Sequence, residues 1–337
     1  MMSLYLILPI LASFLITLFL IPFWIRKARQ IGLLWDDMNK FKSEKVAGSG
    51  GIITILGFTA GVLLFIAYRV FYLKNSIFLI EVLAILSVVI LLSGIGLVDD
   101  LLGWRRGGLS KRSRLVLVAF AAIPLMVINA GKSIMSIPFL GQVDLGFFYP
   151  LLIIPIGVVG ATTTFNFLAG YNGLEAGQGI ILISSFALVA LFTGNSWLSI
   201  IALCMIASLL AFLLYNVSPA KVFPGDSLTY SVGGLLAIIA ILGNFEKVAV
   251  FFFLPYIAET ILKARGRLKK QSFGRPMRDG SLDLQYSKVY GLEHAAILFM
   301  KRLSIKPTEK RVVYLIWLLQ ITIVIIGFLI FRKGIFV

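Results

Sequence analysis

Long apolar stretches, separated by shorter polar segments, recur along the whole chain. Ten of them have about the 20 residues that an α-helix needs to cross the roughly 30 Å hydrocarbon core of a bilayer. They cover residues 3–25, 51–73, 77–98, 113–131, 147–166, 178–194, 196–216, 226–243, 246–264 and 312–332. The pattern predicts an all-α polytopic membrane protein with about ten transmembrane helices, in which residues 1–337 form a single membrane domain.

The composition supports a lipid environment. Of the 337 residues, 59% are hydrophobic and 14% are charged, and the mean hydropathy is +0.99. Soluble globular domains carry about 25% charged residues, so the chain is neither an ordinary water-soluble protein nor a disordered one. The chain has one cysteine, Cys204, and one histidine, His294, which excludes a disulfide framework and a zinc cluster built by this chain alone.

Basic residues are distributed unevenly over the polar segments. The chain has 31 Lys and Arg against 15 Asp and Glu, an excess that in a membrane protein marks cytoplasmic loops rather than nucleic-acid binding. The segments that follow odd-numbered stretches hold 25 of the 31 basic residues. By the positive-inside rule these segments are cytoplasmic, and both termini lie on the non-cytoplasmic side.

Three helix ends on the predicted cytoplasmic face carry oxygen-bearing side chains. Asp99 and Asp100 end the third stretch, Asn166 closes the fifth, and Asp226 opens the eighth. A turn with four glycines and little charge follows Asn166. Because Mg²⁺ prefers a few carboxylate ligands together with substrate phosphates, this set predicts a site for a magnesium-bound phosphate.

Each of these signals also has a simpler interpretation. Asp226 could only cap its helix, Asp99 and Asp100 could be solvated, and the glycine turn could be a tight connection. Their joint occurrence on one face favours a functional site. An ion-coupled transporter is a remote alternative. A transporter would place acidic groups near the bilayer midplane in two related halves, whereas here the acidic residues lie at helix ends and the two halves are unrelated.

The motifs around these residues resemble those of the polyprenyl-phosphate N-acetylhexosamine-1-phosphate transferases. Besides the aspartate pair, the resemblance rests on Asn-Gly-Leu-Glu-Ala-Gly-Gln at 172–178, Val-Phe-Pro-Gly-Asp at 222–226 and Leu-Gln-Tyr-Ser-Lys at 284–288. The last cytoplasmic segment has Arg-Pro-Met-Arg at 275–278, where bacterial members carry a histidine-rich motif. The chain is therefore most similar to the archaeal and eukaryotic UDP-GlcNAc:dolichyl-phosphate GlcNAc-1-phosphate transferases.

The resemblance implies an enzyme that transfers GlcNAc-1-phosphate from UDP-GlcNAc to a polyprenyl or dolichyl phosphate and releases UMP. This would be the first step of lipid-linked oligosaccharide assembly for N-glycosylation. The alternative is the same reaction with another UDP-N-acetylhexosamine in cell-wall or surface polysaccharide synthesis. The expected setting is the plasma membrane of an archaeon or another prokaryote, with the endoplasmic reticulum as the eukaryotic equivalent, and the active site faces the cytoplasm. Membrane lipid is an expected partner, nucleic acid is not, and a homodimer is left open.

The implied reaction explains the residue types. A lipid phosphate that attacks UDP-GlcNAc brings about four negative charges together, and Mg²⁺, or alternatively Mn²⁺, would offset them with nearby cationic side chains. The resemblance implies Asp226 and Asn166 as metal ligands, Asp99, Asp100, Lys111 and Arg114 as catalytic residues, and Phe223, Asn172, Gly170, Glu175, Arg275, Arg278, Met38 and Glu44 as substrate-binding residues. The choice between Lys111 and Arg114 as the phosphate-binding cation stays open, as does a general-base role for Asp99 or Asp100.

Two further features concern the C-terminal part of the chain. Residues 265–311 are too polar to cross a bilayer and predict a cytoplasmic cap over the substrate, with a short hairpin around Asp279 and Gly280. Pro255 predicts a bend within the ninth apolar stretch, because proline removes a helical hydrogen bond.

Overall fold

The structure is a computed structural model that describes residues 4–137 and 141–336. Within these residues, eight helical segments are long and apolar enough to cross a membrane, and each coincides with one of the predicted stretches. They are α1 (Leu4–Ile31), α2 (Gly51–Ala67) with the π-helix η1 (Tyr68–Tyr72), α3 (Leu79–Arg106), the π-helix η2 (Tyr149–Ile153) with α6 (Ile154–Phe167), α7 (Leu174–Phe192), α8 (Ser196–Asn216), α9 (Gly225–Gly243) and α13 (Glu309–Ile330). The chain is a helical, polytopic membrane protein, as predicted.

The other two predicted stretches form broken helices. The fourth is divided into α4 (Lys111–Ala121) and α5 (Ile123–Val127), and the ninth into α10 (Glu246–Phe252) and α11 (Leu254–Arg265). Pro124 and Pro255 lie in the first turn of α5 and α11, where the missing proline N–H interrupts the hydrogen-bond ladder. The predicted bend near Pro255 coincides with the interruption between α10 and α11, and the count of ten spans stays a prediction.

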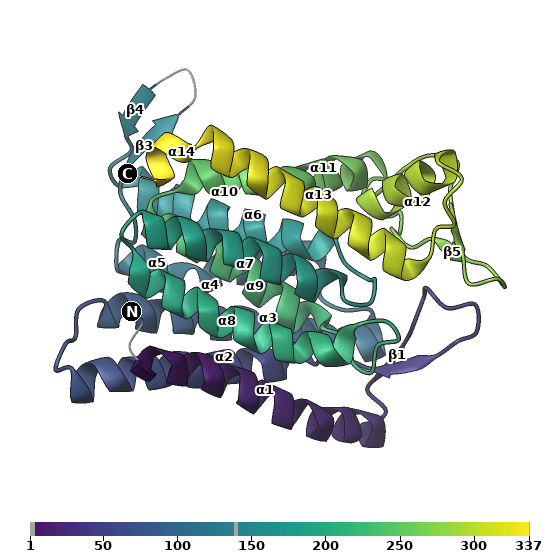
Figure 1. Ribbon diagram of the computed structural model, residues 1–337, viewed down its shortest axis with the longest axis horizontal. Helices are drawn as coiled ribbons and strands as arrows, with labels where there is room; N and C mark the ends of the chain where they lie inside the picture. Colours follow the sequence, from purple (N-terminus) through teal and green to yellow (C-terminus); the bar gives the residue numbers. More distant parts are fainter. Residues whose placement is uncertain (1–3, 138–140, 337) are drawn as a thin grey trace.

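The helices lie side by side along one common direction (Figure 1). Helix α9 is the most central, because it contacts α3, α6 and α7 and is buried over most of its length. Both termini lie at one end of the bundle, together with α14 (Arg332–Ile335), and β1 and β5 lie at the opposite end (Figure 1). Termini at the same end agree with the predicted even number of crossings.

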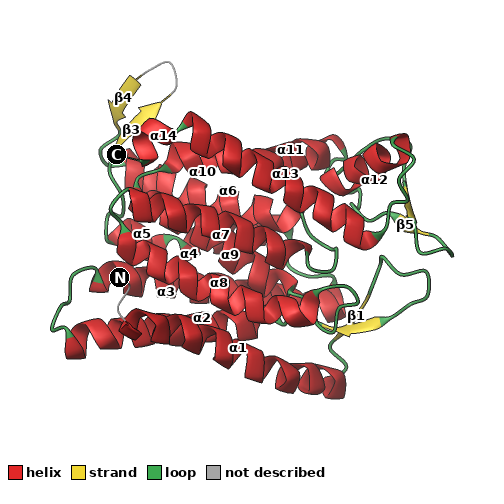
Figure 2. Ribbon diagram, viewed as in Figure 1, coloured by secondary structure: helices red, strands yellow, loops and turns green. Residues whose placement is uncertain are grey.

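Within the described residues, three two-stranded antiparallel hairpins lie at the ends of the bundle (Figure 2). Strands β1 (Leu34–Asp36) and β2 (Lys45–Ala47) pair with Leu34 opposite Ala47, and β3 (Ile134–Ile137) pairs with β4 (Gly141–Asp144). Strands β5 (Arg275–Pro276) and β6 (Leu282–Asp283) enclose Asp279 and Gly280, which confirms the predicted hairpin. The first two hairpins were not predicted, because strands of three or four residues leave little periodicity in a sequence.

The predicted cap lies between α11 and α13 and holds the β5–β6 hairpin and α12 (Leu292–Arg302). His294 on α12 is fully buried; its Nδ1 accepts the backbone N–H of Tyr290 at 3.3 Å, so its Nε2–H donates to the Phe273 carbonyl at 3.1 Å. Burial lowers the pKa of His294, which favours this neutral form. The only histidine of the sequence is thus a packing residue of the cap, as its position suggests.

Candidate active site

A cavity of about 500 Å³ lies at the end of the bundle that carries β1 and β5. It is enclosed by the C-terminal ends of α3 and α6, the N-terminal end of α9, the α6–α7 turn and the segment around β1. Eight of the predicted site residues line it: Met38, Asp100, Asn166, Gly170, Asn172, Glu175, Phe223 and Asp226. Segments that are distant in the sequence therefore converge on one hollow, as the motifs predict.

Asp100 joins the end of α3 to the start of α9. Its Oδ1 accepts the backbone N–H of Asp226 at 2.8 Å, and its Oδ2 accepts that of Ser227 at 3.5 Å. The first N–H groups of a helix have no intrahelical partner and carry partial positive charge, so a carboxylate is favoured there. Glycine permits this approach, because a Cβ at Gly96 would lie 2.4 Å from the Asp226 backbone and one at Gly225, where φ is +69°, would lie 2.2 Å from Asp100 Oδ2.

Asp99 is buried directly behind the cavity wall. Its carboxylate accepts hydrogen bonds from the Leu109 backbone N–H at 2.8 Å, from Arg114 Nη2 at 2.9 Å and from the Tyr230 hydroxyl at 3.0 Å. Arg114 also forms an ion pair with Asp99 through Nε. Of the two cations that the sequence left open, Arg114 is thus the one beside the aspartates.

Thr229 links Asn166 to the first turn of α9, which carries Asp226. The Thr229 hydroxyl lies 2.9 Å from Asn166 Oδ1, to which it donates, and 3.4 Å from the backbone carbonyl oxygen of Asp226. Across the described residues, no three His, Cys, Asp or Glu side chains form a preformed metal cluster. Mg²⁺ commonly takes one or two protein oxygens and completes its shell with substrate phosphate and water, so the Asn166 and Asp226 oxygens fit a site of that type.

The charges around this point also favour a cation. Asp99 and Asp100 both act on Asp226 through like-charge repulsion, and Arg114 is the cation that opposes it. Three carboxylates and one guanidinium leave an excess of negative charge when all are ionised. A divalent cation would neutralise this excess, whereas a diphosphate alone would increase it.

The other side of the cavity is formed by aromatic side chains and the α6–α7 turn. Phe223 is fixed by its backbone, whose N–H donates to Ala47 O at 2.8 Å and whose carbonyl accepts from Gly50 N at 2.8 Å. Gly170 has φ +108°, and a Cβ there would lie 2.7 Å from the Phe273 ring, so only glycine fits. Glu175 supports the turn, because its Oε1 accepts the Gly170 N–H at 2.7 Å.

Further aromatic residues complete this side of the cavity, and the sequence did not indicate them. Phe273 lines the cavity and stacks against Tyr171 with ring centroids 6.3 Å apart. The Tyr171 hydroxyl accepts the backbone N–H of Gly274 at 3.0 Å. Trp35 of β1 also lines the cavity. Aromatic residues are so common in this chain that their spacing alone gives no signal for a site.

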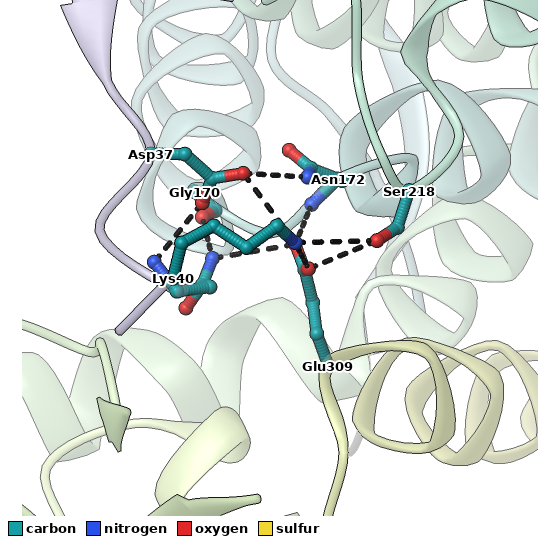
Figure 3. A network of polar contacts seen from close by, with 7 residues as sticks. Asp37, Lys40, Gly170, Asn172, Ser218 and Glu309 are labelled. Atoms are coloured by element: carbon teal, nitrogen blue, oxygen red, sulfur yellow. Dashed lines mark hydrogen bonds and ion pairs between the residues drawn. The ribbon is translucent and has the colours of Figure 1, made fainter. Parts of the chain in front are cut away.

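A polar network secures the α6–α7 turn (Figure 3). The Asn172 side-chain nitrogen donates to Asp37 Oδ2 at 2.9 Å, and the Asn172 backbone N–H donates to Glu309 Oε1 at 2.9 Å. Glu309 Oε2 accepts from Lys40 Nζ at 2.5 Å and from Ser218 Oγ at 3.1 Å. Burial alone would lower the pKa of Lys40, but Glu309 and Asp37 together raise it, so the ammonium stays charged.

Six predicted site residues lie outside the cavity lining: Asp99 and Arg114, which pair with each other, and four others. Lys111 is exposed and donates to the Leu268 carbonyl of the cap at 3.4 Å, and the Glu44 side chain is exposed. Arg275 and Arg278 line a separate hollow of about 660 Å³, where the Arg278 guanidinium lies 5.8 Å from the Phe41 ring centroid. The roles of Lys111, Glu44, Arg275 and Arg278 stay predictions, because these residues do not line the cavity.

The sequence is similar to proteins of known families over most of its length. A protein of Saccharolobus solfataricus with the provisional name UDP-N-acetylglucosamine–dolichyl-phosphate N-acetylglucosaminephosphotransferase is 36% identical over 325 residues, 94% of each chain. The Dictyostelium discoideum UDP-N-acetylglucosamine–dolichyl-phosphate N-acetylglucosaminephosphotransferase is 31% identical over 281 residues, 72% of this chain and 67% of the relative. The phospho-N-acetylmuramoyl-pentapeptide-transferase of Halalkalibacterium halodurans is 31% identical over 274 residues, 77% of this chain and 82% of the relative.

The family match covers the helices that build the cavity. The sequence model of glycosyl transferase family 4 matches residues 82–244, which run from α3 to the end of α9. Asp99, Asp100, Asn166 and Asp226 all lie within this segment. The match and the relatives confirm the family that the motifs resemble, and the chain belongs to glycosyl transferase family 4.

Proposed function

We propose that this protein transfers GlcNAc-1-phosphate from UDP-GlcNAc to a polyprenyl phosphate of the dolichyl type, giving polyprenyl-diphosphate-GlcNAc and UMP. The observation that carries the proposal is the cavity itself, where Asp100 and Asp226 meet Asn166 beside an aromatic and glycine-lined pocket. The names of the S. solfataricus and D. discoideum relatives support the donor and the acceptor. This reaction would begin lipid-linked oligosaccharide assembly for N-glycosylation.

The phosphate end of the cavity is the part that α3, α6 and α9 form. Asp226 and Asn166 would hold Mg²⁺, or Mn²⁺ in its place, and the ion would supply Lewis-acid stabilisation of the charge on the diphosphate. Arg114 holds Asp99 in place and adds positive charge near the reacting phosphates. These groups reduce the repulsion between two anionic substrates, which is the main obstacle to the reaction.

In this proposal Asp99 and Asp100 position their neighbours and add negative charge that favours a bound cation, but neither acts as a general base. Asp100 holds the first turn of α9 and Asp99 holds Arg114, so both carboxylates already have structural partners. A phosphate monoester has a second pKa near 6 and is mostly dianionic at neutral pH, so the attacking oxygen needs no general base. Correct placement of two bound substrates can itself supply a large part of a rate enhancement.

The uridine would bind at the other end of the cavity. Phe223 offers an aromatic face to the pyrimidine, and Gly170 lets the backbone of the α6–α7 turn approach closely. Asn172 offers an amide to the edge of the base. Arg275 and Arg278 lie in the cap hairpin, where closure of the cap would be needed to bring them to the sugar.

The orientation in the membrane follows from charge. The 25 basic residues that follow odd-numbered stretches lie at the C-terminal ends of α1, α3 and α11, at the N-terminal ends of α4 and α13, and in the segments after α1, α8 and α11. These parts of the chain lie at the end of the bundle that carries the cavity. By the positive-inside rule we expect the cavity to face the cytoplasm, where UDP-sugars are available. The membrane in this proposal is a prokaryotic, archaeal-type plasma membrane. Both termini would face the other side.

The proposal is tested by turnover of the purified protein in lipid nanodiscs. With UDP-GlcNAc, Mg²⁺ and a polyprenyl phosphate it should release UMP and form a lipid-linked sugar that is detected by mass spectrometry. Asp226→Ala should abolish turnover, whereas Asp144→Asn, an exposed aspartate at the opposite end of the bundle, should not. Folded protein that makes no product from UDP-GlcNAc, UDP-GalNAc or UDP-MurNAc-pentapeptide would contradict the proposal.

A further inference from the structure

The orientation of one amide in the cavity wall is fixed by its neighbour. Asn172 has a carbonyl oxygen and an NH₂ group of nearly equal size, and either could face a bound base. Asp37 decides between them, because its carboxylate accepts hydrogen bonds and cannot donate one when ionised. The Asn172 NH₂ group therefore points to Asp37 Oδ2, at 2.9 Å.

Asp37 is itself held in place, so the orientation that it imposes on the Asn172 amide is fixed. It is 4% exposed, its Oδ1 accepts the Asn39 backbone N–H at 3.0 Å, and Lys40 Nζ lies 3.6 Å from its Oδ2. The Asn39 side chain donates to the Gly170 carbonyl at 2.8 Å, which ties the Asp37 loop to the α6–α7 turn. The backbone N–H of Asn172 donates to Glu309, so the turn is held at a second point.

The carbonyl oxygen is then the polar group that Asn172 offers to the cavity. Asn172 lines the cavity, its NH₂ group is engaged by Asp37, and Figure 3 shows its side-chain oxygen turned away from the network. A hydrogen-bond acceptor at this point attracts an N–H on the edge of a nucleobase and repels a lone pair. Uracil carries N–H at position 3, whereas cytosine carries a lone pair there.

We propose that Asp37 is a specificity-determining residue that selects uridine over cytidine nucleotides by holding the Asn172 amide with its oxygen toward position 3 of the base. The inference rests on the proposed function, because it assumes that a nucleoside diphosphate binds in this cavity. It assigns Asp37, which touches only protein, a positioning role. Glu309 supports that role by accepting the backbone N–H of Asn172. Lys40 supports it by placing a positive charge beside the Asp37 carboxylate.

Equilibrium binding of free nucleotides tests the inference without turnover. Wild-type protein should bind UDP more tightly than CDP or N3-methyl-UDP by about tenfold or more, since both analogues leave the Asn172 oxygen without its donor. In Asp37→Asn, the new side chain can donate or accept, so the Asn172 amide can reverse. The ratio of the CDP and UDP dissociation constants should then fall by about tenfold.

The exchange variant Asp37→Asn with Asn172→Asp provides a rescue that a purely structural role would not show. Because an ionised carboxylate only accepts hydrogen bonds, the NH₂ group introduced at position 37 would donate to the carboxylate introduced at position 172. The second carboxylate oxygen at position 172 would again face the base as an acceptor. The preference for UDP should return while the total charge of the network is unchanged. Asp144→Asn is the matched control for an aspartate lost outside the network.

Each result decides the inference. Equal binding of UDP and CDP by wild type would overturn it, and so would a folded Asp37→Asn that keeps the wild-type ratio. A double variant that folds without regaining the preference would also contradict it. If wild type binds none of these nucleotides, the proposed function itself fails, which is distinguishable from a failure of Asp37 alone.

Discussion

The carboxylate of Asp100, at the end of α3, accepts the backbone N–H of Asp226, the second residue of α9, at 2.8 Å. This hydrogen bond couples the aspartate pair to the proposed metal ligand across 126 residues of sequence. Asp100 therefore has both a structural and an electrostatic function. The two can be separated by substitution.

Replacing Asp100 separates its two functions. Asp100→Asn keeps an acceptor for the start of α9 but removes a charge, so we expect thermal stability near wild type and turnover lowered by about 100-fold. Asp100→Ala also removes the acceptor and should lower the free energy of unfolding by about 1 kcal/mol. Turnover and thermal unfolding in one detergent measure both effects. Equal losses of stability in the two variants would contradict the capping role.

Arg114 and Lys111 should respond differently to truncation. Arg114→Ala leaves the buried Asp99 without its cation, so we expect a loss of about 1–3 kcal/mol of stability together with most of the turnover. Lys111→Ala removes an exposed contact to the Leu268 carbonyl and should leave stability close to wild type. Unfolding curves and UMP release distinguish them. A greater effect at Lys111 would reverse the assignment of the phosphate-binding cation.

Metal binding should depend on the nucleotide. The protein offers Asp226 and Asn166 as ligands and relies on phosphate oxygens for the rest, so Mn²⁺ should bind at least about tenfold more tightly when UDP is present. Electron paramagnetic resonance of Mn²⁺ titrations measures free and bound ion. Asp226→Ala should remove the nucleotide-dependent fraction. Tight stoichiometric binding without nucleotide would contradict a site that the substrate completes.

Gly170 should not accept a side chain. An alanine there would be strained at φ +108° and would place its Cβ 2.7 Å from the Phe273 ring. We expect Gly170→Ala to weaken UDP binding by about tenfold or more, because the α6–α7 turn must shift. Adding Phe273→Ala relieves the clash but not the strained backbone, so recovery should be partial. Full recovery in the double variant would show that the backbone conformation is unimportant.

The cap should become less stable as pH rises, because it buries Glu293. This carboxyl is fully buried without a hydrogen-bond partner, and burial, with repulsion from Glu259, raises its pKa well above the ordinary value. Above about pH 4.5 the unfolded carboxyl releases its proton while the folded one keeps it, so stability falls with rising pH until the folded pKa is passed.

Replacing Glu293 tests this pH dependence. Glu293→Gln has no proton to lose, so it should raise the unfolding temperature at about pH 8 and have little effect near pH 5. The expected gain at the higher pH is on the order of 1 kcal/mol. Thermal unfolding across this range measures it, with Asp144→Asn as the control. A pH-independent difference would point to packing instead of ionisation.

The sequence predicted the helices and the convergence of their ends, but not the network beside the proposed nucleotide site. Apolar stretches of about 20 residues are long enough to be recognised, and Asp99, Asp100, Asn166 and Asp226 are conspicuous because the chain has few acids. Asp37 and Glu309 are not conspicuous, since each lies in a polar segment where charge is expected. Only the fold brings them to Asn172.

The break between α4 and α5 and the cavity-lining cap residue Phe273 were missed for a related reason. Hydropathy averages over a window, so α4 and α5 are indistinguishable from one span until the interruption near Pro124 is seen in three dimensions. Phe273 lines the cavity only because the cap folds against Tyr171. Contacts of this kind depend on tertiary packing, which no local pattern encodes.

The contacts of Glu309 also constrain how the molecule is assembled during synthesis. Its partners Lys40 and Asn39 precede it by 269 and 270 residues, and Asn172 precedes it by 137. The proposed nucleotide pocket therefore remains incomplete until α13 has left the ribosome and packed against the other helices. A chain that stalls before this helix would carry every motif of the phosphate end and still lack an ordered base-binding wall.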